Sequence, residues 1–221
     1  MLTPGLAFAD RTFDAILFDM DGTLISSIAA VDRAWAQWAG EHGLDATTFR
    51  ISHGRPARDL VEELVPPAQV EASLARINAL ELADSDGVLA LPGAVALMAA
   101  LPQDRHAVVT SATRDLALTR LAAAGLVIPP VVVTSDETTL GKPDPEPFVL
   151  GAALLGFDPS RCLVVEDAPA GLASGRAAGC ATLAVDGTHD LGELDADAHA
   201  PGLTRVAVAL EADGTLRVVD L

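Results

Sequence analysis

The segment Ala15–Leu24, with the sequence AILFDMDGTL, decides the fold of this chain. Its first four residues form a continuous apolar run, as in strands that are buried on both faces. Asp19 and Asp21 follow, although an aspartate at the end of such a strand weakens it and loses hydration. Gly22 then supplies a flexible turn. The pattern predicts a buried strand that ends in two functional carboxylates, one a nucleophile and the other an acid or base. A turn aspartate with an accidental acidic neighbour is the alternative.

Four later segments repeat this pattern, since each is apolar, rich in β-branched residues and followed by polar side chains. Segments with helical spacing, each ending in a glycine, lie between the later ones. This alternation is typical of an α/β doubly wound fold with a parallel sheet. Such sheets bind ligands at the carboxyl ends of their strands, where the polar side chains lie. The expected strands are His106–Ser111, Val131–Ser135, Cys162–Asp167 and Ala181–Asp186, and the expected helices are Arg114–Gly125, Pro145–Gly156 and Ala168–Gly179.

A long segment without a comparable strand follows the first strand. We therefore expect an all-helical insertion, residues 26–92, and a discontinuous core formed by residues 1–25 and 93–221. At the carboxyl terminus, two strand-like runs around Asp213-Gly214 predict a hairpin. The expected helices of the insertion are Ile28–His42, about Ala57–Leu64 and Pro67–Leu82.

The chain is strongly acidic, with a formal net charge of −17 and a sequence isoelectric point near 4.4. A field of this sign repels nucleic acid and anionic membrane surfaces, so we exclude both as partners. It also repels a phosphorylated substrate, which would need a local centre of positive charge. A bound metal ion together with a lysine could form that centre.

We expect a cytoplasmic protein. The amino-terminal segment lacks the basic region and the long apolar region of a signal peptide. The longest uncharged run, Gly87–Gln103, is interrupted by Pro92-Gly93 and is unsuited to a membrane span. Cys162 and Cys180 lie in apolar surroundings, which favours buried thiols over a disulfide scaffold.

Two further strand ends carry candidate site residues. Glu166 and Asp167 form a second acidic pair at the same edge of the sheet, and such hard oxygen ligands suit Mg²⁺. Capping of the following helix is the alternative for this pair. The Ser111 hydroxyl and the Ala112 N–H stand at a helix start, where phosphate oxygens bind. A structural cap is the alternative there.

Lys142, in the stretch LGKPDPEP, is the only lysine of the chain, and the other thirteen basic residues are arginines. An ammonium is a compact point charge, whereas a guanidinium is a wide planar fork. A slot between carboxylates and a phosphoryl group would favour the ammonium. Pro143, Pro145 and Pro147 restrict the backbone that follows. We interpret Lys142 as a site residue, with an incidental surface lysine and a genomic bias against lysine as the alternatives.

Together and in this order, these pieces resemble the haloacid dehalogenase-like hydrolase superfamily. The motif DxDGTL, a strand-end Ser or Thr, Lys-Pro and an acidic pair are highly specific in combination, and they span Asp19 to Asp167. The resemblance implies a Rossmann-like core and makes the insertion a helical cap. The segments SHGRPARDL, TSATRD, GKPDPEPF and EDAPAGLASGRAAGC are similar to small sugar-phosphate and glycerol-phosphate phosphatases, including 2-deoxyglucose-6-phosphatase-like enzymes.

The resemblance implies roles for the acidic residues. Asp19 would attack phosphorus and form an aspartyl-phosphate. Asp21 would protonate the leaving alcohol and then take a proton from the hydrolytic water. Mg²⁺ would be held by the Asp19 carboxylate, the main-chain carbonyl of Asp21 and Asp167, and whether Glu166 also binds it stays open.

The remaining roles concern the phosphoryl group and the leaving group. Ser111 and the Ala112 N–H would bind a phosphoryl oxygen, and Lys142 would neutralise charge on Asp19 and on the phosphoryl group. These roles agree with the physics of phosphoryl transfer, which depends on positioning and on stabilising oxygen charge. In the cap, the residues that match the family's substrate loop are His53, Gly54, Arg55 and Arg58, with an ion pair to Asp59 or Glu62 as the alternative for Arg58.

Other activities on this fold have different signatures. A 2-haloacid dehalogenase lacks the second aspartate, which is present here as Asp21, and a phosphonoacetaldehyde hydrolase needs a cap lysine, which this cap lacks. A β-phosphoglucomutase carries Thr, His and Lys-Gly where this chain has Ser27, Val31 and His53-Gly54. A non-catalytic phosphate-binding protein is expected to have lost a nucleophile, a metal ligand or the lysine.

The sequence therefore predicts a Mg²⁺-dependent phosphomonoesterase. The resemblance implies that its substrate is a small phosphorylated sugar or polyol, and its expected state is a monomer or a weak homodimer. A β-phosphoglucomutase-type mutase is the alternative, followed by a non-catalytic regulatory protein on the same fold.

Overall fold

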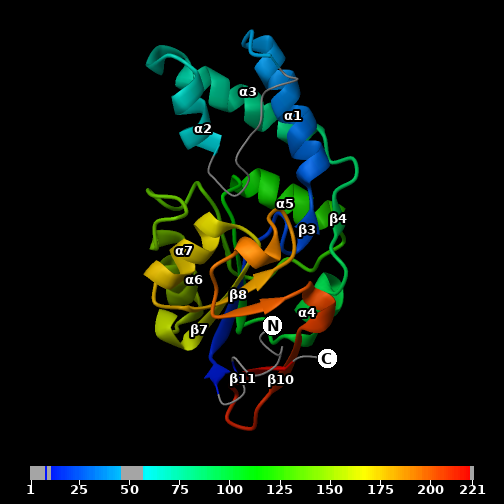
Figure 1. Ribbon diagram of the computed structural model, residues 1–221, viewed down its shortest axis with the longest axis vertical. Coiled ribbons are helices and arrows are strands. Elements are labelled where there is room, and N and C mark those ends of the chain that lie inside the picture. The colour runs from blue at the N-terminus through cyan, green and yellow to red at the C-terminus, as the bar shows by residue number, and fades with distance from the viewer. Residues whose placement is uncertain (1–7, 9–10, 46–56, 220–221) are drawn as a thin grey trace.

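A six-stranded parallel sheet forms the centre of the molecule (Figure 1). The structure is a computed structural model that describes Phe8 and residues 11–45 and 57–219. The strand order is β6-β5-β2-β7-β8-β9, so the chain builds one side of β2 and then the other. This is the order of a Rossmann-like sheet, as predicted. The strands are β2 (Ala15–Phe18), β5 (His106–Val109), β6 (Val132–Val133), β7 (Cys162–Glu166), β8 (Ala181–Val185) and β9 (Ala198–Ala200).

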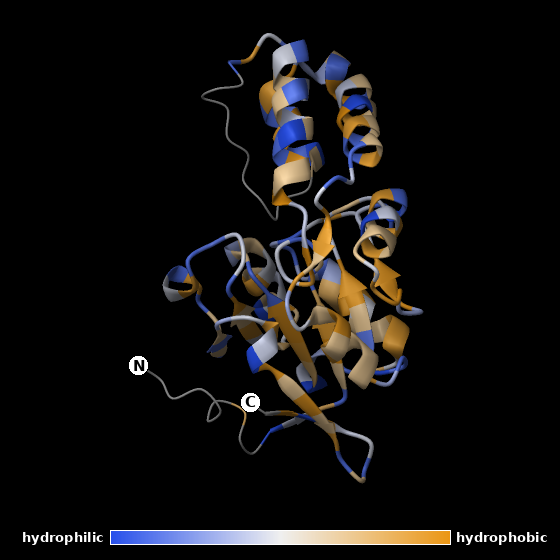
Figure 2. Ribbon diagram, turned by 90° about the vertical axis from the view of Figure 1, so that its right-hand side faces the viewer, coloured by the Kyte–Doolittle hydropathy of each residue, from blue (hydrophilic) through white to orange (hydrophobic). Residues whose placement is uncertain are grey.

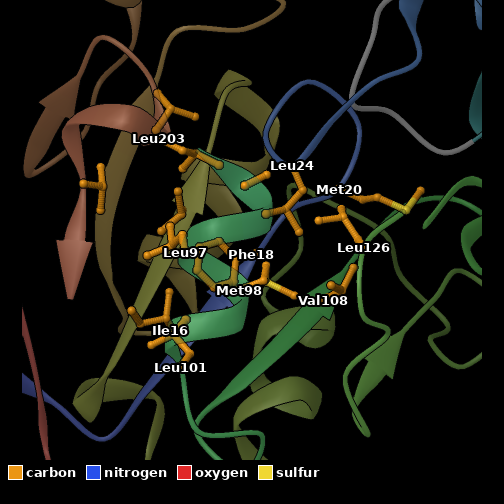
Figure 3. Close-up of a cluster of buried hydrophobic side chains, with 14 of the residues drawn as sticks. Ile16, Phe18, Met20, Leu24, Leu97, Met98, Leu101, Val108, Leu126 and Leu203 are labelled. Carbon is orange, nitrogen blue, oxygen red and sulfur yellow. The ribbon is translucent and has the colours of Figure 1, made fainter. Parts of the chain in front are cut away.

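Helices cover both faces of the sheet because its strands are apolar on both faces. Ile16 and Phe18 of β2 pack into the cluster around helix α4 (Figure 3). Ala15 and Leu17 of the same strand lie in another cluster, with Phe148 of helix α6. Figure 2 shows the strands largely in the apolar colour. The predicted doubly wound sheet is confirmed, and its helices are α4 (Ala94–Ala100), α5 (Arg114–Ala123), α6 (Glu146–Leu155) and α7 (Pro169–Ala177).

Three helices stand apart from the sheet and have a hydrophobic cluster of their own (Figure 1). Trp38 lies at its centre, fully buried, and donates its indole N–H to the Ser73 carbonyl at 3.0 Å. The helices agree with the predicted ones, whereas the domain boundaries stay a prediction. The three helices are α1 (Ile28–Glu41), α2 (Ala57–Leu64) and α3 (Val70–Ala83), and the 3₁₀ turn η1 (Pro67–Gln69) precedes α3.

The connection between cap and core corrects one prediction, because the insertion is not all-helical. Strand β3 (Ile25–Ser26) pairs antiparallel with β4 (Leu89–Ala90), so a short ribbon carries the chain into the cap and back. Two residues per strand are too few to leave a period-two pattern in the sequence. Strand β9 and helix α4 also escape prediction, since the first is very short and the second lies in an uncharged run with no polar face.

A second, antiparallel sheet joins the two ends of the described chain. Strands β10 (Ala207–Leu210) and β11 (Leu216–Val219) form the predicted hairpin, and β1 (Thr12–Phe13) pairs with β11. Its Leu216 is fully buried in the main core cluster, which ties this sheet to the domain.

Both cysteines of the chain are thiols in the structure. Cys162 and Cys180 are free and buried, as predicted, and burial raises the pKa of each thiol to about 12. Within the described ranges, no helix combines the length and the apolar character needed to cross a bilayer.

Gly93 lies where the chain returns from the cap to the core, and we expect the fold to require glycine at this position. Its φ is +94°, and a Cβ there would lie 2.6 Å from backbone atoms of Leu203 and Thr204. We expect Gly93→Ala to lower the free energy of unfolding by at least about 2 kcal/mol. The left-handed conformation alone costs alanine about 1–2 kcal/mol, and the facing backbone cannot move aside as a side chain would. Urea unfolding measures the change.

Gly40→Ala is the matched control for this substitution. Gly40 lies in α1, and a Cβ there would have no neighbour within 4 Å. Alanine is favoured over glycine in a helix by about 1 kcal/mol, so this variant should be as stable as the parent or more stable. A Gly93→Ala protein within about 0.5 kcal/mol of the parent would contradict the role assigned to Gly93.

Candidate active site

Lys142 lies in the loop between β6 and α6 and is almost completely buried, at 2% exposed. Its ammonium donates three hydrogen bonds, to Asp19 Oδ1 at 2.6 Å, Glu166 Oε1 at 2.8 Å and the Val109 carbonyl at 2.9 Å. The ring of Phe148 lies 5.0 Å from Nζ. Three acceptors around one nitrogen match an ammonium, whereas a planar guanidinium would not fit the same point. The two carboxylates raise the pKa of Lys142 despite its burial, so it stays protonated.

Asp19 follows β2 at the carboxyl end of the sheet, between β5 and β7. Its backbone N–H donates to the Val165 carbonyl at 3.0 Å, which fixes it at the end of the parallel ladder. The side chain is buried, and burial together with the charge of Glu166 raises its pKa to about 7, against the lowering effect of Lys142. An aspartate held here offers a carboxylate oxygen beside a permanent positive charge.

Asp167 is held by hydroxyl and amide donors instead of by a cation. Thr23 donates to Oδ1 at 3.2 Å, and Thr188 donates to Oδ2 from its N–H at 2.7 Å and its hydroxyl at 2.6 Å. Burial and the nearby Asp19 raise the pKa of Asp167 to about 6. Thr188 escapes prediction from the sequence, although its position in the polar loop after β8 could have indicated it.

Two glycines let the loops approach Asp167 this closely. A Cβ at Gly22, whose φ is +93°, would lie 2.2 Å from Asp167 Oδ2. A Cβ at Gly187 would lie 2.5 Å from the Asp167 Cβ and from the Gly22 carbonyl oxygen. The glycine that follows the aspartate pair in the sequence therefore makes space for the second acidic pair.

Glu166 is occupied by contacts within the core. Oε1 accepts from Lys142, and Oε2 accepts from the N–H groups of Asp167 and Ala168, each at 2.9 Å. These amides lead into α7, so the carboxylate supports the backbone before the helix. A Cβ at Gly171 would lie 1.6 Å from Oε1, so only glycine leaves room for this arrangement.

The acidic cluster could hold a metal ion. Asp19, Glu166 and Asp167 each offer a carboxylate oxygen, and these oxygens lie within 4.8 Å of one another. Three carboxylates beside one ammonium leave two negative charges without compensation when all are ionised. Burial, and to a smaller extent these like charges, raises the pKa values of Asp19, Asp167 and Glu166. A divalent cation would balance the two uncompensated charges, and oxygen donors suit Mg²⁺. The donor set and its charge therefore fit the predicted ion.

Asp21 lies apart from the lysine and contacts a different set of donors. Ser27 donates to Oδ1, and Arg120 Nη1 of α5 lies 3.2 Å from both carboxylate oxygens. Arg120 also reaches Glu81 of the cap helix α3, with Nη2 3.5 Å from Oε1. Burial raises the pKa of Glu81, partly offset by Arg120. Arg120 escapes prediction, although an arginine four residues after Leu116 on the buried face of α5 is a signal that could have found it.

A cleft of about 510 Å³ lies between the cap and the core. Cap helices α2 and α3 line one side, and the loops after β5 and β6 line the other. Of the predicted phosphate-binding residues, Ser111 and Ala112 line it, and Gly141 beside Lys142 does too. Lys142 itself, Asp19 and Asp21 are not among its lining residues, so the cleft borders the acidic site through the loops that carry Ser111 and Gly141. The Ala112 N–H donates to Thr110 Oγ1 at 3.2 Å, so a phosphoryl oxygen would have to replace this contact.

The cap residues proposed for substrate binding divide into two groups. His53, Gly54 and Arg55 lie outside the described residues. Arg58 lines the cleft and pairs with Glu71 at 2.8 Å and, at 3.5 Å, with Glu62. The expected ion-pair alternative for Arg58 is thus present, with Glu71 as the closer partner.

Residues 13–179 match the model of the haloacid dehalogenase-like hydrolase family. The chain belongs to this family. It is 40% identical over 207 residues to hexitol phosphatase A of Escherichia coli (strain K12), covering 90% of this chain and 95% of that protein. It is 36% identical over 191 residues to glycerol-1-phosphate phosphohydrolase 2 of Saccharomyces cerevisiae, covering 80% of this chain and 76% of that protein.

A solved structure of the same family supports this assignment. The crystal structure of a HAD family hydrolase from Deinococcus radiodurans R1, with bound phosphate and sodium, has a TM-score of 0.64 and 28% identity, covering 88% of this chain and 93% of that one. The resemblance seen in the sequence is therefore confirmed for the family, the fold and the general class of hydrolase.

In this haloacid dehalogenase-like hydrolase, the buried carboxylates should link stability to pH. Asp19 and Asp167 have folded pKa values of about 7 and about 6, above their ordinary value of 3.8. Between the ordinary pKa and the folded pKa of each group, the metal-free fold keeps a proton that the unfolded chain has released. The free energy of unfolding of the metal-free protein therefore falls as pH rises through that range. A divalent cation competes with those protons. We expect Mg²⁺ to raise Tm more at about pH 8 than at about pH 5.5, as measured by thermal unfolding with Mg²⁺ or EDTA.

Two variants separate the site from the rest of the acidic surface. Asp167→Asn should lose most of the Mg²⁺-dependent rise in Tm, because it removes one buried carboxylate. Asp195→Asn is the matched control, since the Asp195 side chain is 87% exposed and pairs with Arg176. An equal rise at both pH values, or a full rise in Asp167→Asn, would exclude this cluster as the metal site.

Proposed function

We propose that this chain is a Mg²⁺-dependent phosphomonoesterase that acts on a small sugar or polyol phosphate through an aspartyl-phosphate intermediate. The observation that carries the proposal is the buried contact of Lys142 with Asp19 at the carboxyl end of β2. A carboxylate that only stabilised the fold would not need three further charged groups around it. The names of the two relatives, a hexitol phosphatase and a glycerol-1-phosphate phosphohydrolase, support the same class of substrate.

The first step forms a bond between Asp19 and phosphorus. A carboxylate oxygen of Asp19 attacks the phosphoryl group, the bond from phosphorus to the substrate oxygen breaks, and Asp21 gives that oxygen a proton. Lys142 stays beside Asp19 and balances the charge of the phosphoryl oxygens, which is the main electrostatic task in phosphoryl transfer. Ser111 and the Ala112 N–H orient one phosphoryl oxygen from the loop after β5.

The second step releases phosphate. Asp21, now ionised, takes a proton from water, the water oxygen attacks phosphorus, and the bond from phosphorus to Asp19 breaks. Asp19 and Asp167, with the main-chain carbonyl of Asp21, would hold Mg²⁺. When bound, the ion supplies positive charge to the phosphoryl oxygens. Glu166 is assigned to Lys142 and to the backbone amides, not to the ion.

The cleft and the charge of the chain support a small substrate. A volume of about 510 Å³ admits a phosphorylated sugar or polyol. The net charge of −17 opposes a polyanionic partner such as nucleic acid. Arg58 and Glu71 on the cap side, with Ser135 and Asp136 on the core side, present polar groups to substrate hydroxyls. For the assembly, we propose a monomer or a weak homodimer.

Phosphate release from a panel of phosphomonoesters tests this function. Glycerol phosphates, hexitol phosphates, hexose 6-phosphates, β-glucose 1-phosphate and mononucleotides are compared with Mg²⁺ and with EDTA. We expect metal-dependent release from a sugar or polyol phosphate, and a loss of at least about 10³-fold in kcat for Asp19→Asn, since a nucleophile is removed.

Asp14→Asn is the control for the nucleophile, because Asp14 flanks the opposite end of the same strand and pairs with Arg161 at 3.1 Å. It should retain parental activity. Release that is unaffected by EDTA, or Asp19→Asn near the parental rate, would contradict the proposal. Conversion of β-glucose 1-phosphate to glucose 6-phosphate without net release would indicate the mutase instead.

Lys142→Arg tests why this position is a lysine. The guanidinium keeps the charge but cannot place one nitrogen within 2.6–2.9 Å of three acceptors in a buried slot. We expect kcat/KM to fall by at least about 10²-fold in steady-state assays. Arg176→Lys, the reverse exchange at an exposed ion pair, should leave kcat/KM unchanged. A fully active Lys142→Arg enzyme would mean that only the charge matters.

A further inference from the structure

We infer that Arg120 is a positioning residue for Asp21, and that Glu81 makes this positioning depend on the cap. The inference rests on the proposed function, in which Asp21 is the acid and base. Arg120 Nη1 lies 3.2 Å from both Asp21 oxygens, and Nη2 lies 3.5 Å from Glu81. One guanidinium thus joins a carboxylate of the active-site loop to a carboxylate of the cap.

Burying the Arg120 guanidinium costs free energy, which needs an explanation beyond the packing of α5. Its side chain is 4% exposed, and the rest of the buried face of α5 is apolar, with Leu116, Ala117 and Leu121. A buried ion pair stabilises a fold no better than apolar residues of similar size. Its Nε is a buried donor without an acceptor in the part of the chain that the structure describes. Packing of α5 alone therefore does not account for an arginine here.

The cap reaches Asp21 from both of its connections to the core. Ser27, which donates to Asp21, directly precedes the first cap helix α1. Glu81, which holds Arg120, lies in the last turn of α3, the final cap helix, where α3 packs beside α5 (Figure 1). Glu81 also lines the cleft. The orientation of the Asp21 carboxyl is thereby fixed by groups that belong to, or are bound by, the cap.

This arrangement makes a prediction that depends on the leaving group. An alkoxide needs a proton from Asp21 as it leaves, whereas p-nitrophenolate is stable enough to leave without one. Because kcat/KM covers only the steps up to departure of the leaving group, it excludes the later attack of water. A misplaced Asp21 should therefore lower kcat/KM for an alkyl phosphate and spare that for p-nitrophenyl phosphate.

The experiment compares kcat/KM of the parent, Arg120→Met and Glu81→Gln on these two substrate types, with glycerol 1-phosphate or the best alkyl phosphate of the panel. For Arg120→Met we expect a loss of at least about 30-fold on the alkyl phosphate and less than about 3-fold on p-nitrophenyl phosphate, as expected for impaired general-acid catalysis. Glu81→Gln should show the same selectivity with a smaller loss. Asp21→Asn should show the full selective loss of kcat/KM on the alkyl phosphate. Adding Arg120→Met to Asp21→Asn should lower kcat/KM little further.

Controls separate positioning from folding. Arg176→Met removes an arginine from an exposed ion pair on α7 and should change neither value. If Arg120→Met alone folds poorly because Glu81 is left unpaired, the double variant Arg120→Met/Glu81→Gln removes both charges and is measured instead. Equal losses on both substrates would overturn the inference while the phosphatase function stands. A parent enzyme that hydrolyses neither substrate type would instead contradict the proposed function.

Discussion

The ammonium of Lys142 is the interaction on which the site depends. It lies against two buried carboxylates and a strand carbonyl, and it is the only positive charge bonded to the acidic cluster in the part of the chain that the structure describes. Removing it would leave Asp19 and Glu166 buried side by side without compensation, which is among the most destabilising changes in a protein interior. Glu166 in turn needs Gly171, whose missing side chain leaves room for its carboxylate. The local glycines and the single lysine are thus parts of one electrostatic arrangement.

The topology of the sheet explains why residues far apart in the chain meet here. Strand β2 lies between β5 and β7, where the strand order reverses direction, and parallel strands place their carboxyl ends along one edge. Asp19, Ser111 and Asp167 follow β2, β5 and β7, so each reaches the same edge without a long loop. Lys142 comes from the loop after β6, and its ammonium donates a hydrogen bond to Asp19 at this edge. The sheet therefore determines the distances, and the side chains determine the chemistry.

The sequence predicts the features that local physics specifies and misses those that depend on tertiary contact. Continuous apolar runs indicate β2, β5, β6, β7 and β8, and polar residues at their ends indicate the core of the candidate site. Arg120 stands on the otherwise apolar face of α5, which marks it as unusual, but its partners cannot be predicted from that helix, because only the packing of α3 on α5 brings Arg120 and Glu81 together. Thr188 is similar, since its role follows from the approach of the loop after β8 to Asp167. The short ribbon β3–β4 is set by the geometry of entry into the cap.

Asp19 and Asp21 are two residues apart, yet their carboxylates are held by different parts of the molecule. Asp19 is bonded to the sheet through the Val165 carbonyl and to Lys142, so its position belongs to the rigid core. Asp21 is bonded to Ser27 before α1 and, through Arg120, to Glu81 in α3, so its position belongs to the cap connections. In the proposed mechanism, a shift of the cap would then move the Asp21 carboxyl, the proton donor, while the carboxylates of Asp19 and Asp167 stay in place. The cap also lines the cleft. Under this proposal, a substrate that fits the cleft poorly would therefore lose proton transfer from Asp21 as well as binding. Selectivity would then depend on proton transfer in addition to the fit of the cleft.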